Sequence, residues 1–336
     1  MPRITALPLF VAAVSVSAPA HADHPVAGGS VSGSGPIVTT SAETPAPGSL
    51  AAGIQATLTR PDSYDDAELI AFAAQHVEAH TTDFNLRFNA SLAYGLSDHL
   101  AVSANLPLIR RDDLRGGRHG HASGASTNGV EDLGTVSGLG DLSLMAQYVL
   151  ADRHEQGWAL AILAGLKLPT GSTTEAADDG ERLETEHQPG TGSWDPLLGL
   201  AAQKRWGATS LHGSVLYQVS SRGSQDTRLG DRLNLNAALV FDLSREPEHE
   251  EPEHQDHGGL ALVLETNYER EGPQEIAGTV DDESGGEILW LSPGLRFAPA
   301  AGWSAGLSAG VPVWQRIGVS HPENAFRLIV QLGTGF

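Results

Sequence analysis

The 336-residue sequence has no cysteine, few basic residues and, beyond its N-terminus, no long hydrophobic run. Without cysteine, neither disulfide bonds nor thiolate metal sites can form. Lysine and arginine number 20 against 41 aspartates and glutamates, which gives a formal charge of −21. Nucleic acid is therefore excluded as a partner, because neutralising its phosphates requires clustered basic side chains. No run after the N-terminus is long and apolar enough to predict a membrane-spanning helix.

The N-terminus predicts export. Arg3 precedes an apolar run from Ile4 to Ala18, and Ala20-His21-Ala22 is a small-x-small pattern of the kind that signal peptidase cuts. Residues 1–22 are therefore predicted to be a signal peptide. Residues 23–48 are rich in Gly, Ser, Thr, Pro and Ala without periodicity, so we expect a flexible periplasmic segment there.

The rest of the chain is dominated by strict alternation of apolar and polar residues. At the C-terminus Leu328, Val330 and Leu332 lie on one face of a strand, and Arg327, Gln331 and Gly333 lie on the other. This period of two is typical of a strand between lipid and a watery lumen. Twelve such segments occur, at residues 49–59, 82–95, 98–110, 139–151, 157–169, 193–206, 208–220, 229–243, 258–270, 286–298, 302–314 and 325–336. The sequence therefore predicts an all-β fold, a transmembrane antiparallel up-and-down β-barrel of about twelve strands over residues 49–336.

The lengths of the links support this interpretation. Starting from a periplasmic N-terminus, the odd-numbered links are mostly long, and four of the five even-numbered links are short. Outer-membrane barrels have long extracellular loops and short periplasmic turns. Both barrel ends are thus expected at the periplasmic side of the cell outer membrane. The first long link is also predicted to contain a short helix over residues 65–75, because apolar residues recur at helical spacing after an acidic start.

Aromatic residues fall near strand ends, as two interfacial girdles require. The periplasmic set is Tyr94, Trp158, Trp206, Phe241, Phe297, Trp303 and Phe336, and the extracellular set is Trp194, Tyr217, Tyr268 and Trp314. Trp290 has lumenal parity, which indicates either a pore-lining side chain or a slip in the assigned register. Phe336, as a terminal aromatic on the lipid-facing side, is the residue that we expect the barrel-assembly machinery to read.

Three stretches carry a family resemblance: Gly138-Leu139-Gly140-Asp141-Leu142-Ser143-Leu144, Leu166-Lys167-Leu168-Pro169-Thr170-Gly171, and residues 190–200 continuing to Lys204-Arg205-Trp206-Gly207. In this order and spacing, the chain from about residue 80 to its end resembles the outer-membrane family of channels assigned to the meta-pathway of phenol degradation. The resemblance implies a barrel pore for small, aromatic molecules and carries over no catalytic residue.

Strand parity assigns the candidate lumen-lining residues: Arg87, Asp141, Lys167, Arg232, Asn234, Asn236, Glu265, Asn267, Arg327 and Gln331. Two interpretations are open. The basic members form a constriction that favours anionic solutes, since rings of charge set pore selectivity. Alternatively, they pair with the acidic members and hold the barrel together.

Two further clusters stand outside the strands. The link at residues 244–258 breaks the short-turn rule with a tract of Glu, Pro and His, in which His249, His254 and His257 are candidate ligands for Zn, Cu or Ni. Pro and acidic residues at this density equally suit a solvated linker without metal. His119 and His121 lie with Arg110, Arg111, Arg115 and Arg118 in a long link, where arginine could pair with lipopolysaccharide phosphates. Loop solubility explains that cluster equally well.

No catalytic constellation is recognisable. No Gly-x-Ser-x-Gly elbow occurs, and His76, His80, His99, His187, His212 and His321 are scattered along the chain. The sequence predicts no enzyme and no cofactor. The function that it favours is passive diffusion of small molecules, aromatic or anionic, through the outer membrane, with membrane lipid and lipopolysaccharide as surroundings. The alternative is a plugged structural or adhesion barrel, or an envelope protein linked to metal handling through its His-rich turn.

Overall fold

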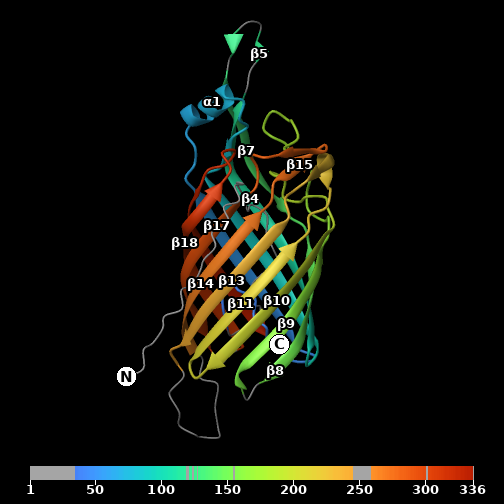
Figure 1. Cartoon of the computed structure of the whole chain (residues 1–336), viewed down its shortest axis with the longest axis vertical. Coiled ribbons are helices and arrows are strands. Elements are labelled where there is room, and N and C mark those ends of the chain that lie inside the picture. The colour runs from blue at the N-terminus through green and yellow to red at the C-terminus, as the bar shows by residue number, and fades with distance from the viewer. Residues whose placement is uncertain are drawn as a thin grey trace, which may run out of the picture.

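The fold is a closed antiparallel barrel of twelve strands (Figure 1). The computed structural model describes residues 35–118, 121–122, 125–126, 128–153, 156–244, 259–299 and 302–335. The barrel strands are β1 (Leu50–Pro61), β3 (Phe84–Ser97), β4 (Leu100–Arg118), β8 (Ser143–Arg153), β9 (Trp158–Lys167), β10 (Asp195–Trp206), β11 (Thr209–Gln218), β13 (Arg232–Asp242), β14 (Gly259–Glu271), β17 (Gly286–Ala298), β18 (Trp303–Ile317) and β19 (Asn324–Gly335). Each strand pairs with its neighbours in sequence, and the pairing of β1 with β19 closes the barrel.

The remaining elements lie in the long links, at the upper end of the barrel in Figure 1. They are α1 (Asp66–Ala74), β2 (His80–Thr81), β5 (His121–Ala122), β6 (Ala125–Ser126), β7 (Gly129–Leu139), η2 (Ser224–Asp226), β12 (Thr227–Arg228), β15 (Gln274–Ile276) and β16 (Thr279–Asp281). The short turns lie at the opposite end, where β1 begins and β19 ends. By the predicted orientation the upper end is extracellular and the lower end periplasmic. No helix in the described part of the chain reaches the length and apolarity that a membrane crossing requires.

All twelve predicted strands are confirmed, each overlapping one strand of the barrel. Alternation separates the two faces clearly in β10, where Leu198 is 62% exposed on the outside and Leu197 is 1% exposed on the inside. Cross-strand pairs share a face, as Leu58 and Leu328 do between β1 and β19. The outer apolar belt therefore continues from strand to strand around the barrel, which is what a lipid-facing surface requires.

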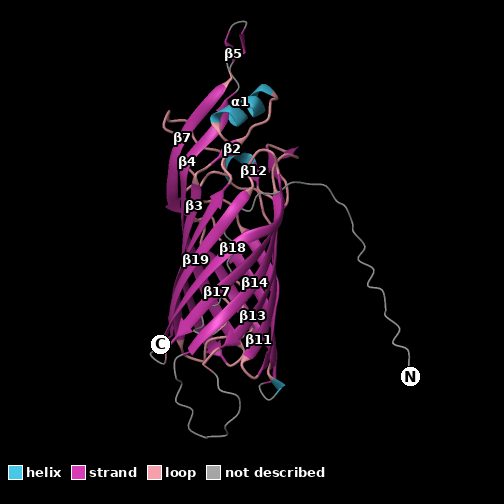
Figure 2. Ribbon diagram, turned by 90° about the vertical axis from the view of Figure 1, so that its left-hand side faces the viewer, coloured by secondary structure: helices cyan, strands magenta, loops and turns pink. Residues whose placement is uncertain are grey.

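One long link differs from the prediction. Residues 112–137 were expected as a loop, but β4 runs on to Arg118 and pairs with β7, so that a hairpin projects above the barrel (Figure 2). A tilted strand crosses the bilayer in about 9–11 residues, so the 19 residues of β4 exceed what a crossing needs. The projecting part is Arg- and Gly-rich, and its apolar residues Leu114 and Val136 pack against Ala177 and Leu183 of another link. It therefore lacks the regular lipid-facing alternation, which is why its strand pairing was missed.

The predicted helix in the first long link is confirmed as α1. Asp65 caps it, because its side chain accepts a hydrogen bond from the Glu68 amide while the Glu68 carboxylate accepts one from the Asp65 amide. The helix buries Leu69 and Ala73. A Cβ at Gly117 would lie 2.6 Å from the Leu69 carbonyl oxygen, so glycine at this place lets α1 pack closely on β4.

The aromatic girdles are present among the described residues. Tyr94, Trp206, Phe241 and Trp303 are each 40–50% exposed at the lower end, and Trp194, Tyr217 and Trp314 are similarly exposed at the upper end. Phe336 lies outside the described residues. Trp290 combines both predicted alternatives: it is buried inside the barrel, and the register between β17 and β18 shifts between Leu289 and Trp290.

The expectation is wrong for residues 35–43 of this segment. These residues were predicted to form a flexible periplasmic segment, but from Gly35 to Glu43 they lie inside the barrel, with Ile37, Thr39 and Ala42 fully buried. Barrel strands supply their partners, as described below. Residues 1–34, including the predicted signal peptide, lie outside the described residues.

Candidate functional site

The lumen of the barrel is the candidate site, and the segment from Gly35 to Glu43, called here the lumen segment, divides it. At mid-height the carboxylate of Glu265 on β14 accepts hydrogen bonds from the amides of Val38 (3.1 Å) and Thr39 (2.9 Å). Glu265 is fully buried, so these amides are the polar contacts that compensate for its burial. Sequence parity placed Glu265 in the lumen correctly but gave no hint of this partner.

The two ends of the lumen segment are held closer to the periplasmic side. Arg296 on β17 donates to the carbonyl oxygens of Gly35 (3.1 Å) and Pro36 (2.7 Å). Gln147 on β8 donates to the carbonyl oxygens of Ser41 and Glu43, both at 3.1 Å. Hydrogen bonds from opposite walls thus fix the lumen segment across the barrel.

Apolar contacts complete the packing of the lumen segment. Ile37 is buried with Val240, Val263 and Ile329, and Ala42 is buried in a second cluster that includes Met145 and Leu197. The lumen segment therefore occupies the periplasmic half of the lumen through apolar contacts as well as the hydrogen bonds from Arg296 and Gln147.

Above the lumen segment lies a cavity of about 1690 Å³, counting the part that is open to solvent. Val38 and Thr40 form part of its lining, together with Arg87, Asn89, Arg232, Asn234, Asn236 and Trp290. The guanidinium carbon of Arg327 lies 4.6 Å from the centre of the Trp290 ring, a cation–π contact. The extracellular half of the lumen thus offers charged, amide and aromatic groups to a solute.

Most of the predicted basic lumen residues are paired with acids. Arg232 donates to Glu271 (2.9 Å) and Arg327 donates to Glu269 (2.7 Å). Arg327 also donates to Asn267, whose amide donates to Asn236 at 3.0 Å. The pairing alternative therefore holds for Arg232 and Arg327, which line the cavity and also join barrel strands. Anion selection by these residues stays a prediction.

Asp141 and Lys167 form a different structure, which joins the three motifs that carry the family resemblance. Lys167 lies 2.7 Å from Asp141 and 3.0 Å from Asp195. Asp141 also accepts hydrogen bonds from the amides of Gly171 and Thr191, both at 2.9 Å. We call these five residues the motif knot; it lies at the extracellular ends of β8, β9 and β10.

Glycine is required beside the motif knot. A Cβ at Gly171 would lie 2.7 Å from backbone atoms of Gly140 and Gly190, and one at Gly190 would lie 2.6 Å from Gly171. Three glycines, one from each motif, therefore let three chain segments approach within backbone contact. The motif residues are accounted for by this packing.

The other predicted residues fall into three groups. Arg87, Asn234 and Asn236 line the cavity, and Gln331 is buried inside the barrel. Arg111 does not belong to an outer-surface cluster: it is 1% exposed and donates to the carbonyl oxygens of Glu186, His187 and Gln188. His249, His254, His257 and His119 lie outside the described residues, as does the side chain of His121, so metal binding at the turn and lipopolysaccharide contact at the loop stay predictions.

His212 pairs with a serine but not with an acid. Its Nε2 lies 2.9 Å from the Ser210 hydroxyl, while its Nδ1 has no hydrogen-bond partner among the described residues. A Ser-His-Asp arrangement needs a carboxylate at that second nitrogen. This pair therefore lacks the residue that would orient the imidazole for catalysis.

Sequence reasoning missed one group of residues at the mouth of the barrel. His80, His187 and His321 were treated as scattered, but all three line the cavity, and their rings lie within 6.3 Å of one another. The available signal was their position, because each lies in an odd-numbered link and all such links meet at the extracellular end.

A family model described as "Putative MetA-pathway of phenol degradation" matches residues 60–249. The chain belongs to this family. The match includes all three stretches of the motif knot, so the predicted family resemblance is confirmed. A search of curated proteins finds no match.

Solved structures similar to this member of the phenol-degradation family are outer-membrane proteins. The COG4313 outer membrane channel from Pseudomonas putida F1 is 19% identical, with a TM-score of 0.56, over 88% of this chain and 97% of that chain. The TodX deltaS2S3 mutant monoaromatic hydrocarbon channel is 8% identical, with a TM-score of 0.41, over 87% of this chain and 90% of that chain. The first of these shows the fold, and with the family membership it identifies the chain as an outer-membrane β-barrel.

Proposed function

We propose that this barrel is a channel through which small aromatic or anionic solutes cross the outer membrane passively. The observation that carries the proposal is the extracellular cavity, which lies inside the barrel wall and is lined by charged, amide and aromatic groups. The phenol-degradation description of the family and the monoaromatic hydrocarbons in the TodX name support an aromatic solute.

Charge in the cavity supports a preference for anions. Five arginines line it, against two glutamates, Glu269 and Glu287. Salt bridges pair Arg232 with Glu271, Arg270 with Glu287 and Arg327 with Glu269. An aromatic carboxylate would combine both kinds of recognition, with Arg327 for the charge and Trp290 for the ring.

The path beyond the cavity is narrow. A twelve-stranded barrel is intermediate between small barrels filled by side chains and wide sixteen-stranded porins. The lumen segment occupies the periplasmic half of this interior, so the solute must pass beside it or the segment must move. We therefore propose a restricted channel in place of an open pore.

The second candidate function is a plugged barrel with a structural or adhesive role. Its support is the same lumen segment, which is held from several strands and packs in two apolar clusters through Ile37 and Ala42. A metal-handling role through the turn at residues 244–258 has no support from the described residues.

Reconstitution into liposomes and planar bilayers tests the proposal. Wild-type protein, Arg232→Ala and Arg327→Ala would be assayed with phenol, benzoate and simple ions. We expect faster passage than in empty bilayers, a preference for benzoate over a cation of similar size, and a several-fold loss of that preference in both variants.

Each failure has a separate meaning. If no solute crosses faster than in empty bilayers, the channel assignment is wrong and the plugged barrel is favoured. If flux occurs but both variants keep the wild-type anion preference, the channel stands and selection by these arginines is wrong. Asp98→Asn, in a periplasmic turn far from the cavity, is the matched control.

A further inference from the structure

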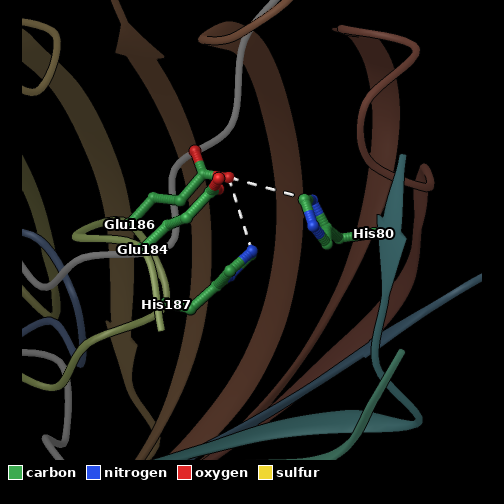
Figure 3. A group of neighbouring side chains, drawn as sticks. All are labelled: His80, Glu184, Glu186 and His187. Atoms are coloured by element: carbon green, nitrogen blue, oxygen red, sulfur yellow. Dashed lines mark ion pairs between the residues drawn. The ribbon is translucent and has the colours of Figure 1, made fainter. Parts of the chain in front are cut away.

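A group of histidines and carboxylates lies at the extracellular mouth, outside the groups used above. His80 comes from β2 in the first link, Glu184, Glu186 and His187 come from the link between β9 and β10, and His321 comes from the link between β18 and β19. Figure 3 shows the carboxylates of Glu184 and Glu186 together, with the imidazoles of His80 and His187 directed at them. Three links that are distant in the sequence thus contribute side chains to one cluster.

The donor atoms of this group lie slightly farther apart than the ligands of a bound metal ion. One ligand atom from each of His80, Glu184, Glu186 and His187 lies within 4.8 Å of the others. Glu186 Oε1 is 3.4 Å from His187 Nε2 and 4.0 Å from His80 Nδ1. Donors around a tetrahedral Zn²⁺ lie about 3.3–3.5 Å apart, given metal–ligand distances near 2.0–2.1 Å. Small rotations of side chains would bring all four donors to one ion.

His80 supplies an independent indication of a ligand. Its Nδ1 is buried and has no hydrogen-bond partner among the described residues, although it faces the Glu186 carboxylate at 4.0 Å. A buried polar atom without a partner is costly, and a metal ion would satisfy it.

Charge balance favours a cation. The carboxylates of Glu184 and Glu186 lie within 4.8 Å of each other and of the imidazoles of His80 and His187. The Gln274 amide donates to Glu186 Oε2 at 2.9 Å, which leaves Oε1 directed at the histidines. A divalent ion would neutralise the two carboxylates.

Surrounding residues orient the ligands, as neighbours of metal ligands commonly do. Arg111 holds the backbone of residues 186–188 through three carbonyl oxygens. The Ser320 hydroxyl lies 3.0 Å from His321 Nδ1, which directs His321 Nε2 toward Glu186 Oε1 at 3.7 Å. The site is therefore built on a fixed frame and not only on long flexible side chains.

We propose that His80, Glu184, Glu186 and His187 bind one divalent transition-metal ion of the Zn²⁺ class, with His321 beside it, and that this ion ties three extracellular links together over the cavity. Imidazole with carboxylate suits Zn²⁺, Ni²⁺ and Cu²⁺ better than Mg²⁺ or Ca²⁺, which prefer oxygen ligands alone. The ion would lie at the wall of the cavity, because His80, His187 and His321 line it.

The test uses full-length protein folded in detergent, stripped with EDTA and titrated with ZnCl₂ by calorimetry. The starting protein carries His249→Ala, His254→Ala and His257→Ala, so that the acidic turn cannot contribute. We expect one Zn²⁺ per chain, and a loss of affinity of about 100-fold or more when His80→Ala and His187→Ala are added. Titration with Co²⁺ should give the visible absorption of a four-coordinate ion only when His80 and His187 are present.

His99→Ala, in a periplasmic turn, is the matched control and should bind as the starting protein does. Glu186→Gln keeps the size of its side chain and serves if the histidine variants fold poorly, as judged by heat-modifiable migration on gels. Zinc binding that is unchanged by both the histidine and the Glu186 substitutions, or that is absent from the starting protein, overturns the proposal. Binding is measured without flux, so this result is independent of the channel proposal.

Discussion

At the scale of single residues, the motif knot explains why short, common-looking motifs mark this family. Asp141 accepts hydrogen bonds from two loop amides and pairs with Lys167, and Lys167 in turn reaches Asp195. Each of these contacts connects residues from two of the three motifs. The motifs therefore form one structure, although each motif alone is common. Together the residues of the motif knot fix the extracellular ends of β8, β9 and β10.

Replacing Asp141 with Ala should destabilise the folded barrel. The substitution leaves Lys167 buried with one acidic partner in place of two and leaves the Gly171 and Thr191 amides without their acceptor. Breaking a buried pair of this kind typically costs about 3 kcal/mol or more. Urea unfolding in detergent, with Asp98→Asn as an exposed control, would measure the loss; equal midpoints for the two variants would show that the knot does not stabilise the barrel.

The position of a single residue was predictable where the residue lies in a strand. Inward parity placed Arg232, Asn236 and Arg327 correctly, because a period of two assigns each side chain to a face. Partners in links were not predictable: the carbonyl oxygens that receive Arg111 and the histidines that meet at Glu186 are brought together by closure of the barrel. No local pattern records such contacts.

At the scale of elements, strands were predictable and the lumen segment was not. Strands show alternation because one face meets lipid, whereas a Gly/Ser/Thr/Pro tract inside the barrel uses its backbone for contact and needs no side-chain period. Arg296, Glu265 and Gln147 bind that backbone from three different strands. The projecting hairpin of β4 and β7 was missed for a related reason, since its pairing is outside the lipid belt.

Deletion of residues 35–43 should increase the conductance of the channel several-fold. Removing this segment empties the periplasmic half of the lumen, while the strand pairs that close the barrel keep their partners. Single-channel recording beside the wild type would measure the change, with Thr40→Ala as a control that keeps the segment in place. Unchanged conductance in a folded deletion variant would mean that the lumen segment does not restrict the path.

At the scale of the whole molecule, composition already limited the choice of architecture. The chain has 40% hydrophobic residues and no long apolar run after its N-terminus. This is too little to form several buried cores, but it is sufficient for a barrel in which only the outer face is apolar. The alternation of long and short links predicts which end of the barrel is extracellular. What composition could not supply was the content of the interior, which depends on contacts between distant strands.

Removal of Phe336 should lower the amount of folded barrel in membranes without altering the conductance of the molecules that do assemble. Gly335, the residue before it, ends β19 at the seam with β1, so this end of the chain belongs to the last strand to complete the barrel. Heat-modifiable migration of membrane fractions would measure the folded amount. Phe336→Tyr, which keeps an aromatic ring, is the matched control and should assemble normally.

Within the described residues, both ends of the lumen segment are held near the same end of the barrel. From Gly48, beside Gly95 at the lower rim, the chain rises to Glu265 at mid-height and returns toward Arg296 near the lower end of β17. The segment forms a loop inside the barrel, and none of the strand pairs that close the barrel includes it. Tension on the segment at Gly48 would therefore load its contacts with the lumen wall without opening a strand pair.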